Sequence, residues 1–155
     1  MKPSRFAVAI VATVLIAACA KTDKAATDSA APAAATVAPK TLSLADVAGT
    51  WQMRSVPLTG DTTPTTYVLT ATADTTGWMI TYPSGLKVPL HVMASGDSII
   101  ITSGKYASQR RKGVMVMTEG ASRLEGGKLM GHTIAHYQGQ KDSVLHLRTE
   151  GTKTP

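Results

Sequence analysis

The amino-acid sequence predicts an all-β fold for residues 42–155, and two patterns lead to that prediction. Eight short windows alternate apolar with other residues or are rich in β-branched residues, as strands with one buried face are. The segments between them are rich in Gly, Asp and Ser, which is typical of tight antiparallel connections. No window carries a sustained helical period. Eight strands with local connections favour a sandwich or an up-and-down barrel.

The chain begins with a segment that has the layout of a secretory signal. Lys2 and Arg5 precede an uncharged apolar run over residues 6–18, and polarity returns at Lys21. A membrane-spanning helix needs roughly 20 apolar residues, whereas the central region of a signal has about 7–15. Residues 1–18 are therefore predicted to be a signal that is removed from the mature protein.

The single cysteine of the chain, Cys19, directly follows this run. It is preceded by Ile16, Ala17 and Ala18, and this segment resembles the lipobox of bacterial lipoproteins. The resemblance implies that the Cys19 sulfur carries a diacylglycerol, with acyl chains such as palmitate, and that two or more chains anchor the protein stably. It also implies, from Ala20, sorting to the outer membrane on its periplasmic side. The alternative is an ordinary signal, cleaved so that Cys19 is removed or left free.

Residues 19–41 are predicted to be a flexible tether between this anchor and the folded part. Ala, Thr, Lys and Pro dominate the segment, which cannot bury enough apolar surface to offset its chain entropy. The remaining residues, 42–155, have the usual size of one domain. They carry 11 Lys and Arg against 8 Asp and Glu, a balance too small to indicate a nucleic-acid partner.

The predicted strands follow one another at short intervals. The clearest window is 86–92, where Leu86, Val88, Leu90 and Val92 occupy every second position. In chain order the windows are 49–56, 65–73, 77–83, 86–92, 97–103, 113–120, 128–137 and 143–151. Closing such a sheet into a ring removes the exposed edges that an open sheet leaves.

Gly49 and Trp51 begin the first window, and Arg148 lies in the last. These residues resemble the Gly-x-Trp start and the closing arginine of the lipocalins and the wider calycin group. The resemblance implies an eight-stranded antiparallel up-and-down barrel in which Arg148 covers Trp51 at the closed end, since a guanidinium can stack on an indole face. The chain is shorter than most lipocalins and shows no helix after the last strand, so we expect a reduced, lipocalin-like barrel.

In such a barrel, the alternation predicts which side chains face inward. These are Trp51, Met53, Tyr67, Leu69, Trp78, Ile80, Tyr82, Leu86, Val88, Leu90, Val92, Ile99, Ile101, Val114, Val116, Leu145 and Leu147. The subset predicted to contact a ligand is Trp51, Met53, Tyr67, Trp78, Ile80, Tyr82, Leu90, Val92 and Val116. An eight-stranded barrel is either filled by side chains or holds one small ligand, and the sequence leaves both open.

One connecting segment concentrates positive charge. Arg110, Arg111 and Lys112 are consecutive, so they form a candidate contact for lipid phosphates, lipopolysaccharide or another anion. The alternative is a solvated hairpin tip.

Two further patterns point away from catalysis and metal binding. His132 and His136 are four residues apart, which along a strand separates their side chains by about 13 Å, so they cannot share one ion. A ligand set across neighbouring strands, such as His132 or His136 with His146, stays open as the alternative to surface histidines, which are favoured. Residues 96–99 read GDSI and resemble the nucleophile motif of the GDSL hydrolases. Here, however, Gly96 and Asp97 precede an isoleucine-rich strand, and a hairpin turn is predicted instead. No catalytic residue, metal site or cofactor is predicted.

We therefore expect a membrane-anchored envelope lipoprotein whose barrel binds, rather than converts, a small apolar or amphipathic ligand. Its expected partners are membrane lipid through Cys19 and that ligand. The alternative is a protein-interaction module, such as an envelope protease inhibitor or an assembly accessory, whose activity lies in the loops or just before Trp51.

Overall fold

Nine strands and one short helix make up the described part of the chain. The computed structural model describes residues 41–139, 141 and 143–155. In chain order the elements are α1 (Leu44–Val47), β1 (Gly49–Pro57), β2 (Thr65–Ala71), β3 (Met79–Thr81), β4 (Lys87–Ser95), β5 (Ser98–Ser103), β6 (Tyr106–Ala107), β7 (Met115–Glu125), β8 (Lys128–Tyr137) and β9 (Val144–Lys153). All of the strands except the two-residue β6 overlap the eight predicted windows.

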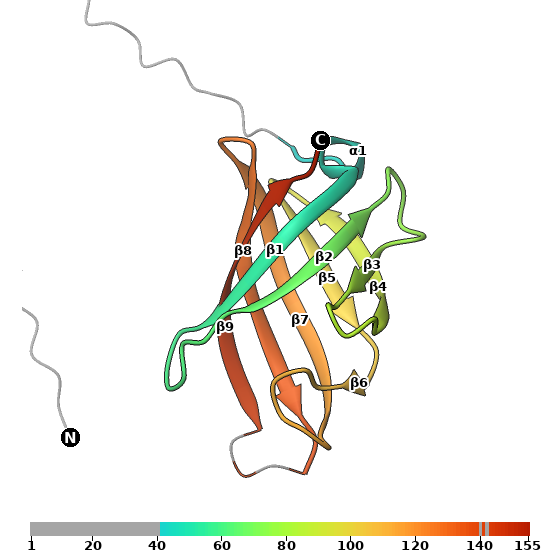
Figure 1. Cartoon of the computed structure of the whole chain (residues 1–155). Coiled ribbons are helices and arrows are strands. Elements are labelled where there is room, and N and C mark those ends of the chain that lie inside the picture. The colour runs from blue at the N-terminus through green and yellow to red at the C-terminus, as the bar shows by residue number, and fades with distance from the viewer. Residues whose placement is uncertain (1–40, 140, 142) are drawn as a thin grey trace, which may run out of the picture. The chain divides into compact units, whose positions relative to one another are not determined.

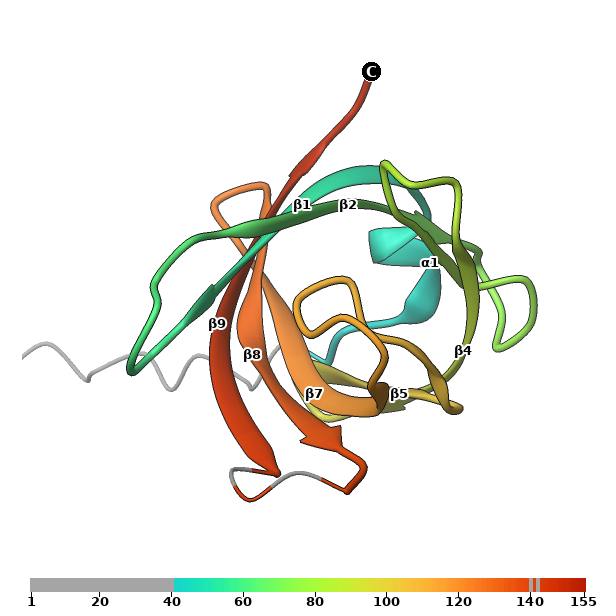
Figure 2. The same ribbon diagram turned by 60° about the horizontal axis from the view of Figure 1, so that its bottom comes forward.

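The strands form a closed ring. From β1 to β5 each strand pairs antiparallel with the next, and β7, β8 and β9 do the same. Pairing of β9 with β1 and of β5 with β7 joins the two halves. The eight-stranded antiparallel up-and-down barrel is thus confirmed, and the sandwich is excluded (Figures 1 and 2). The short β6 pairs with the start of β7, at the end of the barrel away from α1 (Figure 1).

The interior of the ring is the hydrophobic core. Alternate side chains of β1 are buried from Trp51 onward, and β4 buries Val88, Leu90 and Val92 in the same way. Every residue of the predicted inward-facing set lies in this core or packs against it. The prediction succeeded because the strand period of two separates the two faces of each strand. The core also contains residues that were not predicted, namely Leu42, Val47, Ala71, Tyr106, Leu129, Ala135 and Tyr137.

Helix α1 lies across one end of the barrel (Figure 2). Ser43 caps it, because the Ser43 hydroxyl accepts a hydrogen bond from the Asp46 amide while the Asp46 carboxylate accepts one from the Ser43 amide. Val47 is fully buried, and its carbonyl accepts a 2.8 Å hydrogen bond from Trp51 Nε1. This end of the barrel is therefore closed. No helix within the described residues has the length and apolar character needed to cross a bilayer.

The structure corrects the prediction for Arg148. Its side chain is exposed on the outer face of β9, where it pairs with Val56 of β1. The strand partner of Trp51 is Lys153, whose Nζ lies 5.5 Å from the centre of the indole ring. The two cations are five residues apart, so they point to opposite faces of the strand, and only Lys153 points toward Trp51.

Gly49, predicted as a closed-end residue, leaves room for this lysine. Its φ is +136°, a value that residues with a Cβ rarely adopt. A Cβ at this position would lie 2.6 Å from Lys153 Cε. Gly49 thus has a structural role at the closed end, through both its backbone conformation and the lysine that crosses it.

Candidate ligand-binding cavity

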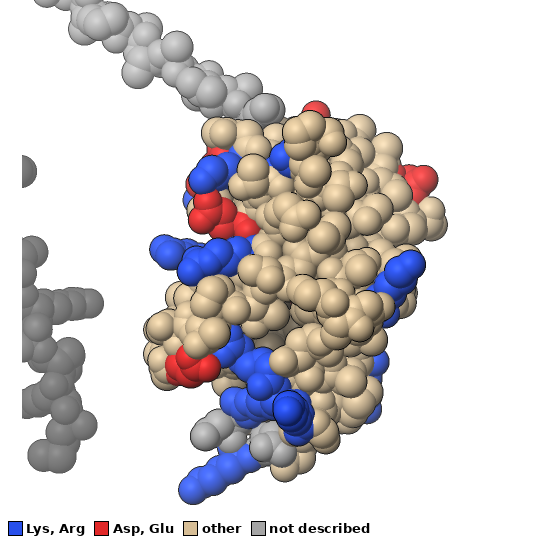
Figure 3. Space-filling view, in the orientation of Figure 1, with Lys and Arg blue, Asp and Glu red and all other residues tan. Residues whose placement is uncertain are grey.

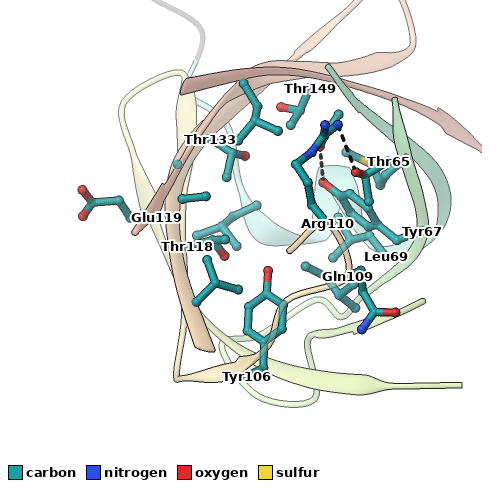
Figure 4. Close-up of a pocket in the computed structure, with 18 of the residues that line it drawn as sticks. Thr65, Tyr67, Leu69, Tyr106, Gln109, Arg110, Thr118, Glu119, Thr133 and Thr149 are labelled. Carbon is teal, nitrogen blue, oxygen red and sulfur yellow. Dashed lines mark hydrogen bonds between the residues drawn. The ribbon is translucent and has the colours of Figure 1, made fainter. Parts of the chain in front are cut away.

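A cavity of about 90 Å³ lies in the part of the barrel away from α1. Residues of all nine strands line it, together with the segment that follows β6. Figure 4 shows the lining side chains converging from these strands. This is the space open to the centres of water-sized spheres, so the cavity has room for several waters. The barrel is therefore not packed solid, although the room inside it is small.

One wall of the cavity is apolar and matches much of the predicted ligand-binding set. Six of the predicted residues line it: Met53, Tyr67, Ile80, Tyr82, Leu90 and Val116. The other three, Trp51, Trp78 and Val92, do not reach it and belong to the packed core. Both indoles are 1% exposed, and Trp78 Nε1 donates a 2.8 Å hydrogen bond to the Asp74 carbonyl. Alternation shows that a side chain faces inward, but not how far along the barrel the cavity extends.

Three tyrosines stand together at this wall. The Tyr82 and Tyr106 hydroxyls are 3.0 Å apart, and the Tyr67 hydroxyl is 3.1 Å from Ser55 Oγ. Burial raises the pKa of Tyr67 to about 12, although the Ser55 hydrogen bond opposes part of the rise. Burial also raises the pKa of Tyr82 and of Tyr106 above the usual value. At neutral pH the tyrosines therefore present uncharged hydroxyls to the cavity.

The cavity also has polar lining residues, and sequence reasoning did not identify them. Thr118, Ser122, Thr133 and Thr149, from β7, β8 and β9, line the cavity. Thr118 is fully engaged with β5, because its amide donates to Ser103 Oγ at 2.9 Å and its hydroxyl lies 3.0 Å from the same oxygen. The sequence did contain a signal for them. Thr118 and Thr149 each lie two residues after an inward-facing apolar residue, Val116 and Leu147, so strand alternation places them on the inner face as well.

The loop after β6 brings an arginine to the mouth of the cavity (Figures 2 and 4). The Ser108 hydroxyl accepts hydrogen bonds from the backbone amides of both residue 110 and residue 111, at 3.1 and 2.9 Å. Arg110 then reaches the β1–β2 loop, where Nη1 lies 3.3 Å from Asp61 Oδ2 and Nη2 donates to the Thr63 carbonyl. Its side chain is only 16% exposed. For Arg110, the alternative of a solvated hairpin tip is therefore wrong.

The other two predicted anion contacts lie outside the cavity. The Arg111 guanidinium lies 4.0 Å from the centre of the Tyr137 ring, and Lys112 is exposed. In the space-filling view, basic side chains gather at the lower end of the barrel, which is the end where β6 lies (Figures 1 and 3). The structure thus divides the basic cluster, with Arg110 turned inward and the next two residues outside.

Two atoms of the cavity lining lack a hydrogen-bond partner. Within the described residues, the buried side-chain nitrogen and oxygen atoms without a partner are Arg110 Nε and Thr149 Oγ1. Thr149 is 2% exposed and follows Leu147 on the inner face of β9. Buried polar atoms are nearly always hydrogen-bonded in proteins, so both atoms call for an explanation.

The histidines and the GDSI segment are located elsewhere. His136 Nε2 lies 3.0 Å from Glu119 Oε1 on the outer face of the barrel. The described residues contain no group of three or more His, Cys, Asp or Glu side chains suited to a metal ion. Gly96 has a φ of +60° in the turn between β4 and β5, so the predicted hairpin turn is confirmed. Cys19, the signal and all of the tether except residue 41 lie outside the described residues.

Comparison of the chain with protein-family models, with curated proteins and with solved structures gives no significant match. The described part of the chain is accordingly characterised by its own geometry: a closed eight-stranded β-barrel whose amphipathic cavity lies beneath an arginine-bearing loop.

Proposed function

We propose that this protein is an envelope lipoprotein whose barrel binds, rather than converts, a small ligand with an apolar body and a polar end. The observation that carries the proposal is the cavity, which Arg110 lines together with apolar and hydroxyl-bearing side chains. Binding sites are typically concave and mostly apolar, with a few convergent polar groups. The polar groups here include uncharged hydroxyls and one guanidinium.

The size of the cavity limits the ligand. Pockets for drug-sized molecules have about 300–1,000 Å³. The space of about 90 Å³ fits a molecule of only a few heavy atoms while the mouth loop is in place. A long-chain lipid would enter only if the Arg110 loop moved away.

Native mass spectrometry of the full chain after mild extraction tests this proposal. We expect a small molecule to be retained at one per chain and to be displaced when a competing short-chain ligand is added. A matched variant, Ala135→Leu, fills the cavity from β8, because Ala135 is 4% exposed and lines the space. Retention of the same mass by that variant would place the ligand elsewhere.

The membrane anchor is the second part of the proposal and rests on residues 1–20 alone. We infer that Cys19 is lipidated and that the mature chain is held at the outer membrane facing the periplasm. Metabolic labelling with a palmitate analogue, followed by membrane fractionation, tests this. Label should appear in the natural chain and be absent from Cys19→Ala, which should leave the membrane fraction. Label in Cys19→Ala, or an unlabelled natural chain, would contradict the inference.

One observation favours the alternative of a protein-interaction module. Among the residues that the structure describes, five large apolar side chains are exposed: Leu58, Met93, Met115, Met117 and Val144. Met117 of β7 and Val144 of β9 both pair with His136 of β8, so they lie on either side of that histidine on the outer face. Crosslinking in envelope extracts distinguishes the two functions, because an interaction module gives a stoichiometric partner that is lost in Met117→Glu, whereas ligand binding is unaffected by that change.

A further inference from the structure

We propose that the ligand is a small carboxylate whose head group lies between Arg110 Nε and Thr149 Oγ1, with its tail against the apolar wall. This inference rests on the proposed function and names the chemical class of the ligand. It is drawn from the two unpartnered atoms, which belong to the same cavity although they are far apart in sequence.

Arg110 lines the cavity, and its Nη1 and Nη2 donors contact the β1–β2 loop and the start of β2. Nη1 lies 3.3 Å from Asp61 Oδ2 and 3.4 Å from the Asp61 carbonyl, and Nη2 contacts the Thr63 carbonyl and, at 3.5 Å, Thr65 Oγ1. These contacts fix the plane of the guanidinium. Nε, which can only donate, remains buried without an acceptor. The arginine is thus oriented by the protein while one of its donors is left for a ligand.

Thr149 supplies the second group. The residue is only 2% exposed, and its hydroxyl has no hydrogen-bond partner. Figure 4 shows the Thr149 and Arg110 side chains on the same side of the cavity, with Thr133 beside Thr149. Nε–H and a hydroxyl can each donate to one oxygen of a carboxylate, which accepts through two oxygens. Hydrogen bonds from ionised groups to ionised acceptors are the stronger kind, so an anion gains more here than a neutral acceptor.

The charges around the cavity favour an anionic head group. Asp61 contacts Arg110 from outside and has a 72% exposed side chain, so solvent screens the pair. Glu119 is also at the cavity, but its carboxylate points away and contacts His136 (Figure 4). No other described Asp or Glu lines the cavity. The inward side of Arg110 therefore has a positive charge and no facing carboxylate.

The tail follows from the apolar wall and from the volume. Met53, Leu69 and Leu147 line the space together with Ile80, Leu90 and Val116. About 90 Å³ leaves room for a carboxyl group and a short hydrocarbon tail. Butyrate and its neutral analogue butyramide are therefore suitable probes, because they have the same length and differ in the charge of the head group.

Isothermal titration of the full chain with butyrate, butyramide and inorganic phosphate tests the inference. We expect butyrate to bind at least about tenfold more tightly than butyramide, the difference that one charge-assisted hydrogen bond gives. Arg110→Gln and Thr149→Val should each weaken butyrate binding by about tenfold and change butyramide binding by less than about threefold. Lys112→Gln is the matched control, because it removes a positive charge from the same loop outside the cavity.

The outcomes separate the two proposals. Equal binding of butyrate and butyramide, or butyrate binding that is unchanged in both Arg110→Gln and Thr149→Val, overturns the head-group assignment and leaves ligand binding standing. Phosphate binding that depends on Arg110, without butyrate binding, overturns the carboxylate class. If none of the probes binds, both proposals fail. Circular dichroism of each variant shows that the barrel is intact, and Thr149→Val serves if Arg110→Gln does not fold.

Discussion

Replacing Thr149 by valine is expected to stabilise the ligand-free protein, although the residue lies in the core. Its side chain is 2% exposed, and its hydroxyl has no hydrogen-bond partner. Leaving a buried polar group unpaired costs about 1–3 kcal/mol. Valine has almost the same shape and replaces the hydroxyl with a methyl group, so that cost is removed. Thr149→Val should therefore raise the stability of the protein while it weakens ligand binding.

The expected gain is worked out from these terms. We take the lower part of that range, about 1 kcal/mol in the free energy of unfolding. For a domain of this size the gain corresponds to a rise of about 4 °C in Tm. Urea unfolding followed by tryptophan fluorescence measures it, and the m-value should not change, because the surface exposed on unfolding is the same.

Thr118→Val, at a threonine on the inner face of β7, is the matched comparison. Its hydroxyl lies 3.0 Å from Ser103 Oγ, so the substitution removes a hydrogen bond and leaves the serine with one partner fewer. We expect it to lower the free energy of unfolding by about 1 kcal/mol. If Thr149→Val also destabilises the protein by that amount, the Thr149 hydroxyl has a partner, and both the prediction and the head-group assignment lose their basis.

Three further predictions concern the closed end and the tyrosines. Trp51→Phe should lower the free energy of unfolding by about 2 kcal/mol, because it removes the 2.8 Å hydrogen bond from Trp51 Nε1 and leaves the Val47 carbonyl unpaired. Urea unfolding followed by circular dichroism checks this, and an unchanged unfolding midpoint would contradict it. Gly49→Ala should lower the free energy of unfolding by about 1–2 kcal/mol or more, because φ is +136° and the added Cβ meets Lys153. Thermal melting compares this variant with Gly60→Ala, a position where φ is also positive but no atom lies within 4 Å of the added Cβ. The pKa of Tyr67 is raised from 10.0 to about 12 in the folded state, so its contribution to stability is fully present below pH 10 and falls as the pH rises toward 12. Unfolding measured across that range should show a shallower slope in Tyr67→Phe, and the rest of the slope belongs to Tyr82 and Tyr106, whose pKa values are also raised.

The strand pattern was predictable because it depends on local alternation. Val88, Leu90 and Val92 occupy every second position, and a strand turns alternate side chains to one face, so no knowledge of distant contacts was needed. Helix α1 was missed because its four residues are too few to show a helical period. The capping box formed by Ser43 and Asp46 was the available signal.

The covering of Trp51 depends on register, which the sequence does not show directly. A shift of one residue in the pairing of β9 with β1 would turn every side chain to the opposite face. The resemblance placed Arg148 over the indole, whereas the observed register brings Lys153 opposite Trp51. The partner of a residue on a distant strand is fixed by the turns and packing of the whole ring.

The candidate site was predictable in part for the same reason. The apolar residues of its wall could be assigned to the interior, but the boundary between the packed core and the cavity depends on the length of the strands and on α1. The inward position of Arg110 depends on contacts with the β1–β2 loop and the first residue of β2, 45 to 49 residues earlier in the chain. Contacts of this kind arise only after the barrel closes.

The central claim is that the barrel holds a ligand in the space beneath Arg110, and one titration tests it most directly. Butyrate is added to the full chain and to Ala135→Leu, whose larger side chain fills the cavity without altering Arg110 or Thr149. The account predicts saturable one-to-one binding to the natural chain and none to the folded variant. Absence of binding to the natural chain, or equal binding to both proteins, would contradict it.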